Sequence, residues 1–186
     1  VLPGIPTGFQ QWPRILKDQE RIKSLFGVTD RDWQDWRWHL KKRVTTVADL
    51  RKYLPLSPQE VEEIGQTGLS YRWVVSPYYL SLIDPDDPAD PIRRQAIPSL
   101  LECADHTGTS DPMDEEHTSP APAVTRRYPD RLIVNVTNQC AMYCRHCQRR
   151  RNIGEKDLAT PRCDLTAALD YVRNNKEIRD VLLTGG

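Results

Sequence analysis

The stretch LIVNVTNQCAMYCRHC, residues 132–147, joins a short apolar run to a segment that carries three cysteines. The run LIVNV at its start, rich in β-branched residues, has the composition of a strand. Cys140, Cys144 and Cys147 follow at the spacing CxxxCxxC. Thiolates are soft, anionic ligands, and three of them on one short loop can hold an iron–sulfur cluster while one metal position stays open. The stretch therefore predicts a strand that leads directly into a metal-binding loop.

A helix and a second apolar run follow the cysteine loop. DLTAALDYVRNN (164–175) has helical periodicity, and VLLTGG (181–186) is an apolar run that ends in glycines. With the first run they predict a β-loop-α-β unit. Because neither run alternates with polar residues, we expect a parallel sheet covered on both faces, with functional loops at the carboxyl ends of its strands. One such unit cannot close a barrel, so we expect the 186 residues to be an N-terminal fragment.

The part of the chain before these strands predicts helices, and all five tryptophans lie in its first 73 residues. One amphipathic helix is expected over residues 29–44, where a capping-box pattern precedes apolar side chains spaced about 3.6 residues apart. Further helices are expected to begin at Thr46, Ser57, Pro77 and Asp90, where capping residues or first-turn prolines stand.

These patterns divide the chain into three parts. Residues 1–104 form an N-terminal helical region, and residues 105–126 form an acidic, proline-rich connecting loop. Residues 127–186 begin the α/β part of the chain.

Composition and charge exclude several classes of function. The chain is 38% hydrophobic and 28% charged, as expected for a soluble globular protein. Its 26 basic residues balance its 26 acidic residues, which argues against nucleic acid or an anionic membrane as a partner. No apolar run approaches the roughly 20 residues that cross a bilayer. We expect a cytoplasmic protein.

The cysteine count argues against a disulfide framework. Five cysteines are an odd number, and three of them crowd into one loop. Cys103 and Cys163 stand alone. We expect them to be ordinary buried thiols, the alternative being additional metal ligands.

The CxxxCxxC motif after a first strand, with a GG turn after a second, resembles the radical S-adenosylmethionine superfamily. The resemblance implies a 4Fe–4S cluster and S-adenosylmethionine as cofactors, and residues 127–186 as the truncated start of a (β/α) barrel. It implies that His146 lies against the nucleoside and that Gly185 and Gly186 receive the cofactor's amino group. The implied cluster ligands are Cys140, Cys144 and Cys147.

A zinc site with His146 as fourth ligand is the alternative interpretation of the loop. Zinc frameworks usually gather their ligands as two separated pairs, whereas His146 and Cys147 are adjacent and difficult to direct at one tetrahedral ion. We therefore favour the cluster. On the zinc alternative the chain would be a non-catalytic helical interaction module with a zinc-stabilised tail.

Within the superfamily, RRYPDR (126–131) and CRHCQRRRNIGE (144–155) resemble the lysine 2,3-aminomutase family, which also uses pyridoxal 5'-phosphate. The resemblance extends through SPYYLSLIDPDDP (76–88) and TSPAP (118–122), and so covers most of the chain.

The family resemblance assigns roles to three arginines. It implies that Arg127 and Arg131 contact the phosphate of pyridoxal phosphate and that Arg149 pairs with the substrate α-carboxylate. Guanidinium groups suit both tasks because they donate paired hydrogen bonds to phosphate or carboxylate. A run of like charges is otherwise most often a solvated patch, and Arg150 and Arg151 are candidates for structural pairing or for phosphate contacts.

TGTSDPMDEEHTSPAP (107–122) and NQCAMYCRHCQRRRNIGE (138–155) look most like the glutamate 2,3-aminomutase branch, with lysine 2,3-aminomutase as the alternative. The resemblance implies an isomerase that converts L-glutamate to β-glutamate. Its partners would be a small amino-acid substrate and an electron donor that reduces the cluster, and a homo-oligomer is compatible with it. We expect the fragment itself to be inactive, because the lysine that the family uses to hold pyridoxal phosphate is not in it.

Overall fold

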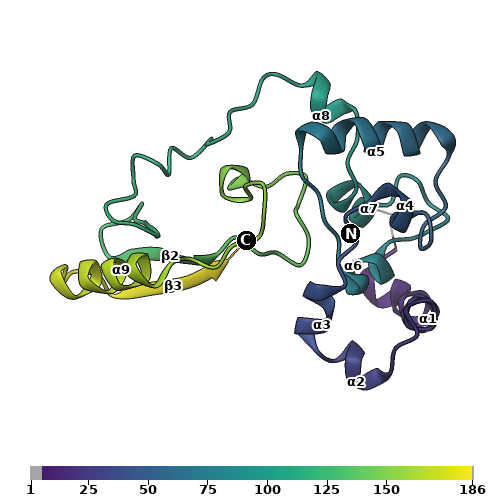
Figure 1. Cartoon of the computed structure of the whole chain (residues 1–186), viewed down its shortest axis with the longest axis horizontal. Coiled ribbons are helices and arrows are strands. Elements are labelled where there is room, and N and C mark those ends of the chain that lie inside the picture. Colours follow the sequence, from purple (N-terminus) through teal and green to yellow (C-terminus); the bar gives the residue numbers. More distant parts are fainter. Residues whose placement is uncertain (1–5, 186) are drawn as a thin grey trace. The chain divides into compact units, whose positions relative to one another are not determined.

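The computed structural model describes residues 6–185, which form two compact units (Figure 1). The helical unit contains the described residues up to Ala104 and, in addition, Ala141–Arg145. The sheet unit contains Asp105–Cys140 and residues 146–185. The middle of the cysteine loop thus belongs to the helical unit, and the two ends of that loop belong to the sheet unit.

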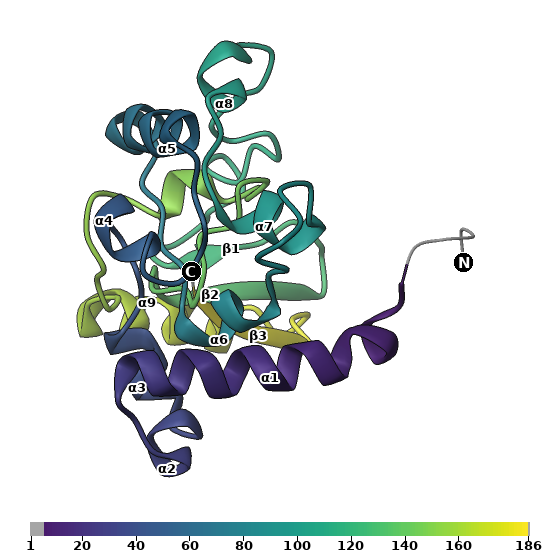
Figure 2. The same ribbon diagram turned by 90° about the vertical axis from the view of Figure 1, so that its right-hand side faces the viewer.

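The helical unit is built mainly from short helices whose first turns are closed by side chains. Thr7, Thr29 and Ser57 each complete a capping box, which satisfies backbone N–H groups that a helix start leaves unpaired. The helices are α1 (Gly8–Phe26), α2 (Asp30–Trp33), α3 (Trp36–Lys41), α4 (Val47–Leu50), α5 (Pro58–Ser70), α6 (Pro77–Leu82), α7 (Pro91–Ala96) and α8 (Leu101–Ala104). Figure 2 shows α6 beside the long helix α1. None of the helices in the described residues is long and apolar enough to span a membrane.

Four of the predicted helix starts are confirmed, at Thr46, Ser57, Pro77 and Asp90. The single helix predicted over residues 29–44 is wrong, because the chain forms α2 and α3 there instead. The Asp35 carboxylate accepts a backbone hydrogen bond and starts α3 as a new N-cap. Val44 lies beyond α3 and pairs with Val75 in an isolated antiparallel bridge.

Part of the cysteine loop completes the core of the helical unit. Met142 is only 6% exposed and forms a bridge with Val75, which is fully buried. The Tyr143 side chain is buried as well, and its backbone N–H donates to the carbonyl of Val74 at 3.1 Å. Burying one such side chain contributes about 1.5–3 kcal/mol. The loop is therefore fixed at its centre by packing.

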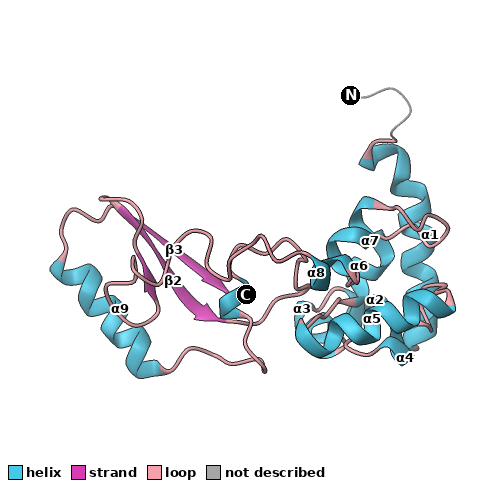
Figure 3. Cartoon of the chain, turned by 90° about the horizontal axis from the view of Figure 1, so that it is seen from above, coloured by secondary structure: helices cyan, strands magenta, loops and turns pink. Residues whose placement is uncertain are grey.

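The sheet unit contains a three-stranded sheet in the order β1-β2-β3. Its elements are β1 (Val124–Thr125), β2 (Arg131–Thr137), the 3-10 helix η1 (Arg150–Asn152), α9 (Arg162–Asn174) and β3 (Asp180–Gly185). β2 and β3 are parallel, with Ile133 opposite Leu182, and β1 is antiparallel to β2. Figure 3 shows α9 running along the sheet, where Leu132, Val134 and Ala168 form a small core. The predicted β-loop-α-β unit is confirmed, and this mixture of helices with a small sheet is consistent with an α/β fold.

Two features of the sheet differ from expectation. The short strand β1 was not expected, because its two residues give no periodic signal. The prediction that both strands are covered on both faces fails for β3, where Leu182 is 52% exposed and Leu183 is 74% exposed. α9 packs chiefly on β2, and among the described residues β3 is an edge strand. Its apolar side chains therefore remain uncovered.

The ion pair between Glu60 and the buried Arg93 gives a stability prediction. We expect Glu60→Gln to lower the free energy of unfolding by about 1–3 kcal/mol at pH 7, because a buried guanidinium loses its carboxylate. Burial alone would raise the pKa of Glu60, but hydrogen bonds from Ser57 and the nearby Arg93 hold it below its ordinary value. The carboxylate therefore stabilises the fold above about pH 4.3, and this contribution is lost as the pH falls through the folded pKa.

Thermal unfolding followed by circular dichroism at pH 7 and at pH values below 4 measures this effect. Glu62→Gln is the matched control, because Glu62 lies exposed on the same helix, and we expect it to change stability by less than about 0.5 kcal/mol. An equal loss of stability for Glu60→Gln at both pH values would contradict the prediction.

Candidate functional site

The three predicted cluster ligands divide between the units. Cys144 packs half-buried against the core of the helical unit, whereas Cys140, which follows the end of β2, and Cys147 belong to the sheet unit. None of the three forms a disulfide within the described residues, and each is only partly exposed. Within residues 6–185, no three His, Cys, Asp or Glu side chains are grouped as a metal site. The donor set itself, three cysteine sulfurs on one short loop, fits a soft metal centre.

Arg145, the residue after Cys144, is anchored in the helical unit. Its guanidinium donates to both carboxylate oxygens of Glu102, at 2.8 and 2.6 Å, and its side chain is only 6% exposed. It also donates to the carbonyl of Arg72 at 3.3 Å, and its backbone N–H donates to Gln95 at 2.8 Å. Cys144 therefore sits between two residues, Tyr143 and Arg145, that the helical unit holds in place.

The three arginines with predicted ligand roles line one cavity of the sheet unit, of about 230 Å³. Arg127 is exposed, and its guanidinium makes no hydrogen bond or ion pair with the described part of the chain. Arg131 lies over the ring of Tyr128 and makes one long contact, 3.4 Å, with the neighbouring Asp130. Two guanidinium groups at this cavity thus have unused donors. The cavity is also lined by Glu115, Thr125, Tyr128, Leu132, Ile133 and Leu182.

Arg149, the third arginine, is paired with Glu115 from the acidic loop. Its Nε lies 3.1 and 3.3 Å from the two carboxylate oxygens, and its Nη2 lies 3.3 Å from one of them. The Glu115 side chain is only 4% exposed. The acidic, turn-rich composition of this loop predicts only a connection and gives Glu115 no role. The sequence offers one signal for the pairing: the three acidic residues 114–116 match in number the three arginines 149–151.

Arg151 pairs with the same loop, which agrees with the structural role considered for it. Its Nη2 donates to Glu115 at 3.4 Å. Its Nε lies 3.2 Å from a carboxylate oxygen of Asp111 without hydrogen-bond alignment. Burial alone would raise the pKa of Asp111, but the N–H groups of Glu116 and Glu115 and the Arg151 guanidinium hold it below its ordinary value. Two acidic side chains, Asp111 and Glu115, thus lie against two guanidinium groups, those of Arg149 and Arg151.

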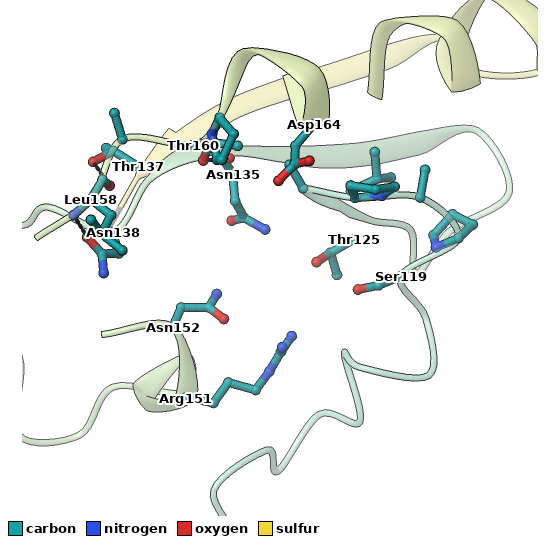
Figure 4. A pocket seen from close by; sticks show the side chains of 17 residues that line it. Ser119, Thr125, Asn135, Thr137, Asn138, Arg151, Asn152, Leu158, Thr160 and Asp164 are labelled. Atoms are coloured by element: carbon teal, nitrogen blue, oxygen red, sulfur yellow. Dashed lines mark hydrogen bonds between the residues drawn. The ribbon is translucent and has the colours of Figure 1, made fainter. Parts of the chain in front are cut away.

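A second cavity, of about 810 Å³, opens at the carboxyl end of β2 (Figure 4). Asn135 and Thr137 line it from the strand, and Arg151 and Asn152 extend toward it from η1. The hydroxyl of Thr160 donates to the carbonyl of Asn135 at 2.6 Å, which ties the loop before α9 to the strand. Amide and hydroxyl groups thus surround the point where β2 leads into the cysteine loop.

The remaining predicted site residues stay predictions. Gly185 lies opposite Thr137 in the parallel pair, and a Cβ at Gly185 would overlap the Thr137 methyl group, so this position suits glycine. Gly186 lies outside the described residues. His146 is exposed, with no hydrogen bond or ion pair to residues 6–185.

The two isolated cysteines differ from each other. Cys163 is exposed, so the expectation that it is a buried thiol is wrong, because it lies in the solvent-facing first turn of α9. Cys103 is half-buried, with its sulfur 3.9 Å from the hydroxyl of Thr67.

Comparison with known proteins gives close relatives, although no family model matches the chain. The chain is 50% identical over 182 residues, 98% of its length, to glutamate 2,3-aminomutase of Clostridioides difficile (strain 630). It is 49% identical over 167 residues to L-lysine 2,3-aminomutase of Clostridium subterminale, and 40% identical over 178 residues to that of Bacillus subtilis (strain 168). It spans 43%, 40% and 38% of the lengths of these three relatives.

These similarities confirm the expected resemblance to the lysine 2,3-aminomutase family. Within that family the first of these relatives is a glutamate 2,3-aminomutase, the branch that the sequence motifs favoured. The identities to a glutamate enzyme and to a lysine enzyme differ by one percentage point, 50% against 49%, so identity alone does not separate the two branches.

Adjacent arginines in RRYPDR allow a test of which one serves the fold. Arg126 donates to the Tyr171 hydroxyl at 2.8 Å and pairs with Glu177 at 2.8 Å, so it ties the turn before β2 to the end of α9. We expect Arg126→Gln to lower the urea midpoint of unfolding, because these groups lose a charged donor. Arg127→Gln is the matched control and should leave the midpoint unchanged. Equal midpoints for the two variants would contradict this assignment.

Proposed function

We propose that the chain is part of a radical S-adenosylmethionine and pyridoxal-phosphate-dependent aminomutase that converts L-glutamate to β-glutamate. The observation that carries the proposal is the cavity shared by Arg127, Arg131 and Arg149. These are the side chains to which the family resemblance assigns the phosphate and carboxylate groups. The 50% identity to a glutamate 2,3-aminomutase supports the same reaction class.

The arginines of the cavity bind and orient anionic groups. Arg127 and Arg131 carry unused donors that suit a phosphate, and Arg149 offers hydrogen bonds to a carboxylate. Ile133 and Leu182 supply apolar walls, which lower the local dielectric and strengthen such charged contacts. The chain's task at this cavity is positioning, which can supply a large part of a rate enhancement.

The cysteine loop provides the second half of the proposed machinery. Cys140, Cys144 and Cys147 would hold a 4Fe–4S cluster, and the packing of Met142 and the anchoring of Arg145 hold the centre of their loop. When bound, the cluster with S-adenosylmethionine supplies a radical, and pyridoxal phosphate carries the migrating nitrogen. An external electron donor would reduce the cluster. We further propose that β2, α9 and β3 begin a (β/α) barrel, an arrangement that the exposed apolar side chains of β3 support.

Lysine is the alternative substrate, because a lysine 2,3-aminomutase is 49% identical to the chain. NMR of the products formed by the whole protein from each amino acid distinguishes the two. Turnover of lysine with glutamate untouched would overturn the preference for glutamate.

Anaerobic reconstitution with iron and sulfide tests the cluster. We expect the wild-type chain to take up both in the ratio of a 4Fe–4S cluster, and Cys140→Ala, Cys144→Ala and Cys147→Ala each to lose most of it, because each removes one thiolate ligand. Iron and sulfide analysis with the visible absorption spectrum measures uptake. Cys163→Ala, which removes an exposed thiol outside the motif, is the control. Tightly bound zinc without iron would support a non-catalytic helical module with a zinc site instead.

Equilibrium titration with pyridoxal phosphate tests the arginine cavity. We expect Arg127→Gln and Arg131→Gln each to weaken binding roughly tenfold, because each removes a charge-assisted hydrogen bond to the phosphate. Arg173→Gln, which removes an exposed arginine of α9 that pairs with Asp170, is the control for lost positive charge. Equal weakening in all three variants would show general charge attraction and contradict the assigned roles.

A further inference from the structure

Glu115 occupies only one of the two hydrogen-bonding edges of Arg149. A guanidinium has five N–H donors, with one parallel pair along Nε and Nη2 and another at the Nη1–Nη2 end. Glu115 lies along the Nε–Nη2 side, at 3.1 to 3.3 Å. Within residues 6–185, the Nη1 atom of Arg149 makes no hydrogen bond. The terminal edge is therefore available for a second carboxylate.

The Glu115 carboxylate is held in place by its own loop. Asp111 accepts the backbone N–H of Glu115 at 3.1 Å and that of Glu116 at 2.9 Å. The carbonyl of Glu115 accepts the hydroxyl of Ser119 at 2.7 Å. A carboxylate that is only 4% exposed must remain paired, and Arg151 provides a second partner at 3.4 Å. Glu115 is thus a fixed counter-ion and not a mobile surface side chain.

The charges that line the cavity favour an additional anion. Three guanidinium groups, those of Arg127, Arg131 and Arg149, face one carboxylate, that of Glu115. Arg127 and Arg131 are exposed, and Asp130 pairs with Arg131 at 3.4 Å from outside the lining. The donors that remain for an anion are chiefly those of Arg127 and the terminal edge of Arg149. Glu115 therefore fixes Arg149 without using all of the guanidinium donors at the cavity.

We propose that Glu115 is a positioning residue, which holds the terminal edge of Arg149 toward the cavity to receive the α-carboxylate of an amino acid. This inference rests on the proposed function and deepens it. It gives the acidic loop a task in substrate recognition, because the loop supplies the group that orients the carboxylate receptor. Glu115 itself touches neither substrate nor cofactor.

The test compares Glu115→Gln with Glu116→Gln in the whole protein loaded with its cofactors. Glu116 is the adjacent exposed residue, so this pair matches the lost charge. We expect Glu115→Gln to raise KM for the amino acid roughly tenfold, with a much smaller change in kcat, because a misoriented Arg149 loses paired hydrogen bonds to the carboxylate. Glu116→Gln should leave both constants unchanged.

A binding measurement without turnover gives a second readout. In calorimetric titrations, L-glutamate should bind the wild type roughly tenfold more tightly than it binds Glu115→Gln. The α-amide of L-glutamate, which lacks the α-carboxylate, should bind both proteins equally weakly. Asp111→Asn weakens the acceptor that holds the Glu115 backbone and leaves the Glu115 carboxylate in place, so it should weaken glutamate binding by a smaller factor. If Glu115→Gln does not fold, Asp111→Asn takes its place in the test.

Three outcomes separate this inference from the function on which it rests. A wild type that takes up no cluster and binds no pyridoxal phosphate would overturn the proposed function. A wild type that binds both, with Glu115→Gln indistinguishable from Glu116→Gln, would overturn the positioning role alone. Tighter glutamate binding by Glu115→Gln would overturn it as well, because Glu115 would then be a competitor for Arg149.

Discussion

The largely shielded ion pair between Arg145 and Glu102, whose side chains are 6% and 18% exposed, is the constraint on which the arrangement of the cysteine loop depends. It lies one residue from Cys144, and it fixes a segment whose neighbours, Met142 and Tyr143, complete the core of the helical unit. Losing either partner would leave the other with fewer charge-assisted hydrogen bonds, so the pair stabilises the position of this segment. A loop that is predicted to bind a metal is therefore also fixed by packing against the helical unit. The helical unit then serves the proposed chemistry by presenting one of the thiols.

Neighbouring arginines in this chain have different tasks, and the reason is where their guanidinium groups find acceptors. Arg126 donates hydrogen bonds to acceptors on and just after α9, including the Tyr171 hydroxyl. Arg127 lines a cavity and leaves its donors unused. Arg149 and Arg151 share the carboxylate of Glu115, yet they line different cavities. The acidic loop and the arginine-rich segment thus act together. The arginine-rich segment 149–151, which composition alone describes as basic, is thus ion-paired with the acidic loop and keeps a few unused hydrogen-bond donors.

The local signals of the sequence predicted much of the secondary structure, and they failed where a capping residue competes with the apolar periodicity. Apolar runs located β2 and β3, and capping patterns located the starts of α4 to α7. The expected helix over residues 29–44 failed because Asp35 caps a new helix inside it. The longest helix, α1, was not delimited, although Thr7 with Gln10 forms a capping box and Gly27 ends it in a left-handed conformation.

The sequence by itself determined the strands β2 and β3, several helix starts, the cysteine spacing and the family resemblance, because each of these depends on residues that are close together in the chain. Only the tertiary structure decided that Glu115 meets Arg149, that Arg149 lines the same cavity as Arg127 and Arg131, and that Leu182 lines it from a neighbouring strand. These pairings join residues far apart in sequence. They follow from strand register and loop path, which no local pattern of hydrophobicity or charge encodes.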